Sequence, residues 1–93
     1  MNKMIYWEGF DMSKALIVLA SSTSAYSVKT MLEKRYKIYT RIVQAPAALS
    51  NLGCAYCLEI DKMDLKTALS LIKMSTVSLR GVYDACTYQT INL

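Results

Sequence analysis

The sequence contains no histidine. Histidine is the commonest general base of enzymes, and its imidazole completes the cysteine–histidine nucleophile pair and most mixed zinc sites. Conventional hydrolase chemistry is therefore not expected of this chain. The cysteines number three, and an odd number does not make a disulfide framework. This favours a reducing compartment, so the cytoplasm is the expected location.

Long apolar runs are also missing. The longest, residues 15–20 (ALIVLA), has six residues, whereas a membrane-spanning helix needs about 18. The N-terminus lacks the apolar stretch followed by small residues that marks a secretory signal. We therefore expect no membrane partner. Hydrophobic residues make up 54% of the 93 residues and charged residues 19%, a balance that favours one small domain with a single core.

The formal net charge of +4 is modest, and the basic residues are scattered apart from one cluster, Lys34, Arg35 and Lys37. This cluster falls at the expected C-terminal end of a helix, where cations interact favourably with the helix dipole. No aromatic RNA-binding motif accompanies it. The sequence therefore predicts a solvated helix end at this position and no nucleic-acid partner.

Two amphipathic patterns predict helices near residues 23–36 and 62–74. A run of serine and threonine at residues 21–24 supplies N-cap oxygens to the first helix, and Asp61 is predicted to cap the second. Apolar and β-branched runs predict four strands. These runs cover residues 15–20, 38–43, 55–60 and 77–83, and Gly81 is expected at a bend or bulge of the last one.

The resulting order is β-α-β-β-α-β, which predicts an α+β fold of the ferredoxin-like type, an antiparallel sheet with two helices on one face. We expect this domain to span residues 14–84, after an N-terminal appendage at residues 1–13 and before a C-terminal tail at residues 85–93. The appendage holds three aromatic side chains, which are expected to pack against the domain or a neighbouring subunit. They are Tyr6, Trp7 and Phe10.

The segment CAYC, residues 54–57, carries a cysteine at each end. Side chains three apart on a strand point to opposite faces, so the two cysteines are not expected to form a disulfide unless the strand bulges. Cys57 is predicted to be a packed small apolar residue or a partly covered surface residue. Cys54 follows Gly53 at a loop–strand junction, where backbone N–H groups can stabilise a thiolate, so Cys54 is the candidate reactive thiol. Cys86 is expected to be structural or incidental.

The segments ALIVLASSTSAYSVKTMLEKRYKIYTRIVQAPAALSNLGCAYCLEID and DLKTALSLI resemble the small selenium/sulfur carrier-like domain family. The resemblance covers about residues 14–83. Ser22 and Thr23 match the turn before the first helix of the family. Three further residues match its loop and the start of its third strand, namely Pro46, Ser50 and Cys54. The chain departs from the family in having Ala47 where a basic residue is usual and Ala55 where glycine is usual.

This resemblance implies a carrier that holds sulfur or selenium on Cys54 as a persulfide or selenosulfide. It implies donor and acceptor proteins as partners, no cofactor, no metal, and at most a thiol-based carrier rather than an enzyme. Gly53, Ser50 and Pro46 would support the site through the loop. A basic residue near the loop, Arg41, is expected to stabilise the thiolate.

Three alternatives remain open from the sequence. The first is a non-catalytic interaction module that forms a homodimer, in which Cys54 is a bystander. The second is a redox disulfide between Cys54 and Cys57. The third is a soft metal ion bound by these two cysteines across two chains.

Overall fold

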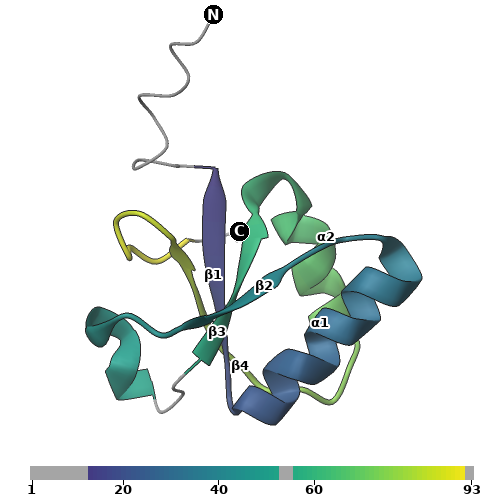
Figure 1. Ribbon diagram of the computed structural model, residues 1–93, viewed down its shortest axis with the longest axis horizontal. Coiled ribbons are helices and arrows are strands. Elements are labelled where there is room, and N and C mark those ends of the chain that lie inside the picture. The colour runs from purple at the N-terminus through teal and green to yellow at the C-terminus, as the bar shows by residue number, and fades with distance from the viewer. Residues whose placement is uncertain (1–12, 53–55, 92–93) are drawn as a thin grey trace, which may run out of the picture.

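The computed structural model describes residues 13–52 and 56–91. Four strands and two α-helices follow one another in the predicted order, with a short 3₁₀ helix, η2, before the third strand (Figure 1). Their bounds are β1 (Lys14–Leu19), α1 (Ser22–Tyr36), β2 (Arg41–Gln44), η2 (Ala47–Leu52), β3 (Tyr56–Asp61), α2 (Lys62–Lys73) and β4 (Leu79–Asp84). The three predicted packing aromatics of residues 1–13 lie outside the described residues.

The strands form one sheet in the order β2-β3-β1-β4, and all three neighbouring pairs are antiparallel. This order, with both helices between strands that are not neighbours, confirms the predicted ferredoxin-like α+β fold. No helix in the described part of the chain has the length and apolar character that a membrane span requires.

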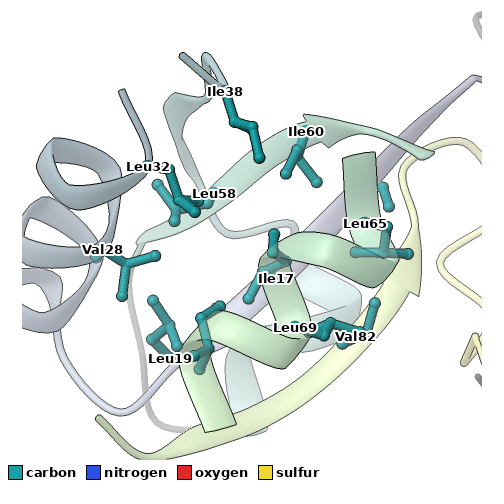
Figure 2. Close-up of a cluster of buried hydrophobic side chains, with 14 residues drawn as sticks. Ile17, Leu19, Val28, Leu32, Ile38, Leu58, Ile60, Leu65, Leu69 and Val82 are labelled. Atoms are coloured by element: carbon teal, nitrogen blue, oxygen red, sulfur yellow. The ribbon is translucent and has the colours of Figure 1, made fainter. Parts of the chain in front are cut away.

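The first helix is set by caps at both ends. Ser21 is the N-cap, and its side-chain oxygen accepts a hydrogen bond of 3.1 Å from the Ser24 N–H. At the other end Lys37 takes a left-handed conformation (φ 57°), and the Ile38 N–H donates to the Leu32 carbonyl at 3.0 Å. The chain therefore turns sharply after α1 and sends the Ile38 side chain back toward the core (Figure 2).

The second helix begins at the predicted residue, but its predicted cap is wrong in one respect. Asp61 occupies the N-cap position without a side-chain capping hydrogen bond. Its carboxylate instead accepts from the Lys14 Nζ at 2.6 Å, because the antiparallel register places Lys14 directly opposite Asp61. A partner on the neighbouring strand thus replaces the local cap.

The main core lies between the helices and one face of the sheet. Alternate residues of β1 point to this face, as expected for a pleated strand, and they meet apolar residues of both helices (Figure 2). The labelled members of this cluster are Ile17, Leu19, Val28, Leu32, Ile38, Leu58, Ile60, Leu65, Leu69 and Val82. Burial of these side chains is the principal favourable term that holds the helices on the sheet.

Gly81 marks an irregularity in β4, as predicted. Val18 pairs with Gly81 and Leu19 pairs with Leu79, so Arg80 is an extra residue between the two pairs. A Cβ atom at Gly81 would lie 2.7 Å from the ring of Tyr83, two residues further along the same strand face. The absence of a side chain at Gly81 therefore lets the Tyr83 ring lie over the strand.

Asp84 ties the end of β4 to the start of α2. One carboxylate oxygen accepts from the Lys62 Nζ at 2.5 Å, and the other accepts from the backbone N–H groups of Cys86 and Thr87 at 2.8 and 3.0 Å. These contacts, the Lys62 hydrogen bond above all, lower the pKa of Asp84 from 3.8 to about 2. The charged form is thus the one that the fold stabilises.

We expect Asp84→Asn to lower the melting temperature at pH 7 and the difference from wild type to shrink as the pH falls from about 4 to 2. Because the folded-state pKa is depressed, the stabilisation is present above pH 3.8 and is lost as the carboxylate is protonated in the folded state. Thermal unfolding followed by circular dichroism at several pH values in this range measures the difference in melting temperature between wild type and variant. Asp64→Asn, an acidic residue in the first turn of α2, is the control and should show a smaller difference. If the melting-temperature difference between wild type and Asp84→Asn did not change with pH, Asp84 would not have the lowered pKa described above.

Candidate functional site

The sheet face opposite the helices carries a second, smaller apolar cluster. Its buried members are Leu16 and Val18 of β1, Cys57 of β3 and Leu49 of η2, each no more than 5% exposed. Partly buried residues from both edge strands and their adjoining segments pack around them, namely Val43, Ala45, Tyr83 and Ala85. The short η2 helix therefore covers a patch of this second face.

Pro46 begins the turn that places Leu49 on this face. Its carbonyl accepts a hydrogen bond of 2.9 Å from the Leu49 N–H, the i to i+3 pattern of a 3₁₀ turn. Proline suits the start of such a turn because its φ is already fixed near the helical value. The loop proline that the resemblance singled out thus has a local role in forming η2.

Cys57 is wholly buried in the second cluster. Its neighbour Leu58 belongs to the helix-side core, as does Ile60, so the predicted alternation of side chains along this strand is confirmed. Of the two positions that the sequence left open for Cys57, packed or partly covered at the surface, the structure shows the packed one. A thiol with no exposed surface cannot reach the sulfur of another protein unless the strand opens locally.

The candidate thiol Cys54, with Gly53 before it, lies outside the described residues, and so does the side chain of Ser50. The structure does describe both flanks of this segment. Leu49 on one side and Cys57 on the other are buried in the same cluster. The fold therefore holds the chain against one face of the sheet at Leu49, before Cys54, and at Cys57, after it.

Arg41 lies at the start of β2, where its guanidinium is 2.9 Å from the carboxylate of Glu59. The register pairs Arg41 with Glu59 and pairs Gln44, at the other end of β2, with Tyr56. Arg41 is therefore three residues along the ladder from the start of β3 and already has a carboxylate partner. Its predicted help to a thiolate at Cys54 stays a prediction.

The third cysteine, Cys86, lies exposed in the turn that follows β4, and its backbone N–H donates to Asp84. Among the residues that the structure describes, no three or more cysteine and carboxylate side chains gather closely enough to hold a metal ion. Of the two cysteines that the structure describes, Cys57 is therefore packed in a core and Cys86 is exposed.

The cover of the second sheet face is the feature that sequence reasoning missed. The resemblance placed Pro46 and Ser50 in a loop before the third strand, and η2 lies in that stretch of the chain. It did not predict that this stretch packs on the sheet. The signal was available in β1, where every residue from Ala15 to Leu19 is apolar and buried, because such a run requires cover on both faces.

A family model matches the region that contains the whole sheet, both helices and η2. Its description is "Putative Se/S carrier protein-like", and the match covers residues 14–84, more than half of the chain. The match therefore covers the whole small α+β domain described above. The chain belongs to this selenium/sulfur carrier-like family. No curated protein and no solved structure was found to match it.

In the Cys54→Ala variant, we expect native-state alkylation with iodoacetamide to add one label, at Cys86, because Cys57 is fully buried and Cys86 is exposed. In denaturant a second label should appear at Cys57 at a rate typical of an unfolded thiol. Intact mass followed by peptide mapping makes the measurement. Equal labelling of Cys57 and Cys86 in the native state would show that the second cluster does not protect Cys57.

Proposed function

We propose that the protein carries sulfur or selenium on Cys54, as a persulfide or a selenosulfide. The observation that carries this proposal is the contrast between the thiols. Cys57 is buried in the second cluster, and Cys86 lies beyond the last residue of the family match. Cys54 is then the remaining thiol within the region that the family model matches.

The loading step needs no external oxidant or reductant. The Cys54 thiolate attacks the terminal sulfur of a persulfide on the donor protein, forms a new S–S bond, and breaks the donor's own S–S bond. The donor leaves as a thiolate, and Cys54 now holds the terminal sulfur. With a donor that carries selenium in the terminal position, the same exchange gives an S–Se bond on Cys54. The oxidation level of the transferred atom is unchanged.

Delivery is the same exchange in the opposite direction. A thiolate of the acceptor protein attacks the terminal atom, and Cys54 leaves as a thiolate. Both steps use a thiolate as nucleophile and a thiolate as leaving group, so the protein needs no general base of its own. This requirement fits a chain without histidine.

The described structure supports the proposal through the flanks of the segment. A carrier thiol has to be reachable by two partner proteins while it remains attached to a stable domain. Leu49 and Cys57 pack on the second face of the sheet and fix the flanks, with five residues from Leu49 to Cys54 and three from Cys54 to Cys57. Pro46 and the main chain of Ser50 belong to this support, since Pro46 begins η2 and Ser50 lies within it. A reducing cytoplasm would keep the thiol available between cycles.

The proposal is tested by mass spectrometry of the intact protein after incubation with a cysteine desulfurase and cysteine, or with the same enzyme and selenocysteine. We expect one added sulfur or selenium atom at Cys54 in wild type and in the Cys86→Ala variant, and none in Cys54→Ala. Addition of an acceptor thiol should then remove the added atom. Cys57→Ala should still gain one atom at Cys54, because the buried Cys57 thiol takes no part in the exchange; the final extent of loading, not its rate, is compared in this variant.

Two results would overturn the carrier function. Loading that persists in Cys54→Ala would assign the atom to another thiol. No loading in wild type under conditions in which the donor persulfide is present would remove the transfer step, and the non-catalytic interaction module would then describe the protein better. A ready Cys54–Cys57 disulfide, seen as a loss of two hydrogens in the intact mass, would favour the redox alternative.

A further inference from the structure

The sheet has two edge strands, β2 and β4, and the chain covers them differently. Residues 85–91 turn back after β4 and bond to its outer side (Figure 1). The Ile91 N–H donates to the Val82 carbonyl at 2.9 Å. The Asp84 N–H donates to the Gln89 carbonyl, also at 2.9 Å. The outer side of β4 is therefore already paired within the chain.

The edge at β2 is open in the part of the chain that the structure describes. In an antiparallel ladder, alternate residues point their N–H and C=O groups away from the neighbouring strand. β2 pairs on one side with β3, and no backbone group of the described residues bonds to its other side. Alternate backbone groups of β2 are therefore available to a further strand.

The side chains of β2 are mostly uncharged and partly apolar. Ile42 packs against the helix-side core and Val43 against the second cluster, and both remain partly exposed. Both apolar layers thus end at this edge with a β-branched side chain that is not fully covered, a type that packs well on a pleated neighbour. The charge of Arg41 is paired with Glu59 at 2.9 Å, so it presents no unpaired cation of the kind that commonly protects an edge strand.

We propose that β2 pairs in antiparallel orientation with β2 of a second copy of the chain, about a two-fold axis at Ile42. The two four-stranded sheets then form one continuous sheet. Only residues whose backbone groups point outward can bond across the new edge, so the axis has to pass through a pair of identical residues and not between two residues. The axis therefore lies at Ile42 or at Val43, the two central residues of β2.

The side chains that face each other favour the axis at Ile42. In this register Ile42 faces Ile42 of the second copy, and Thr40 faces Gln44, so apolar meets apolar and polar meets polar. With the axis at Val43, Ile42 would face the polar Gln44. The same register would extend the ladder to Ala45, next to Pro46, whose carbonyl already begins the turn of η2.

Charge also favours this edge as the place where two copies meet. The chain has a formal net charge of +4, so two copies repel each other over much of their surface. At β2 the one cation is neutralised by Glu59, and in the proposed register Arg41 faces Val43 of the second copy rather than another arginine. A strand of four residues supports a weak dimer rather than a permanent one. The pairing uses β2 and does not depend on transfer at Cys54.

Sedimentation velocity of the full chain over a range from about 10 µM to about 1 mM tests the second copy as the occupant. We expect the average mass to rise from 10.5 kDa toward twice that value, with a dissociation constant on the order of 100 µM. Added salt should not weaken the dimer, because main-chain hydrogen bonds and apolar contacts hold it and salt screens the repulsion between the two copies. A chain that stays monomeric over the whole range would overturn the proposal and leave the edge to a strand of another protein.

The variant Ile42→Cys tests the register, in a background of Cys54→Ala with Cys86→Ala that leaves the buried Cys57 as the one native thiol. At the axis the two Cα atoms of residue 42 lie about 4.5–5.5 Å apart, within the range that a disulfide spans. With oxidised glutathione as oxidant, we expect disulfide-linked dimers on a non-reducing gel.

Val43→Cys in the same background is the matched control, because Val43 is also a partly exposed residue of β2. The two copies of residue 43 are diagonal neighbours about 7–8 Å apart in the proposed register, which is too far for a disulfide. We expect Ile42→Cys to link at least about tenfold faster than this control. Equal rates, or faster linkage through residue 43, would overturn the axis at Ile42.

Discussion

Burial of β1 on both of its faces is the constraint on which the rest of the structure depends. Every residue from Ala15 to Leu19 is buried, although a strand of an antiparallel sheet often has one face in water. The two helices can cover only the face that carries Ile17 and Leu19. The other face, with Leu16 and Val18, needs a cover of its own, and η2 provides it.

This second cover connects the fold to the candidate thiol. Pro46 begins η2, Leu49 packs on Leu16 and Val18, and Cys57 completes the same cluster from β3. The segment that contains Cys54 therefore runs between two buried residues of one small core. Cys57 stabilises this sheet face, and Cys54 is the thiol that we propose as the carrier.

The sequence predicted much of this fold because its local signals agree with the tertiary structure. Ser21 caps α1, and Cys57 and Leu58 alternate between the faces of β3 as the strand pattern required. The prediction that the Asp61 side chain caps α2 was wrong because this side chain pairs with Lys14. The register of β1 and β3 places Lys14 opposite Asp61, and no local sequence pattern encodes that register. The packing of η2 was missed for the same reason, since it depends on which face of a distant strand lacks a cover. Of the site, strand periodicity predicted that Cys57 and Leu58 point to opposite faces, but the burial of Cys57 depends on the cover by η2, and the ion pair of Arg41 with Glu59 depends on register.

The central claim, that packing of η2 on the second face supports transfer at Cys54, is tested most directly by the rate at which donor persulfide loads Cys54 in two matched variants. Leu49→Ala and Leu65→Ala remove the same atoms from buried positions, the first on the η2 side of the sheet and the second on the helix side. Measured on folded protein in single-turnover experiments, Leu49→Ala should load about tenfold more slowly or worse, because the segment loses one of its two attachments. Leu65→Ala should be less stable but should load at the wild-type rate. Equal loading rates in wild type and Leu49→Ala would contradict the account.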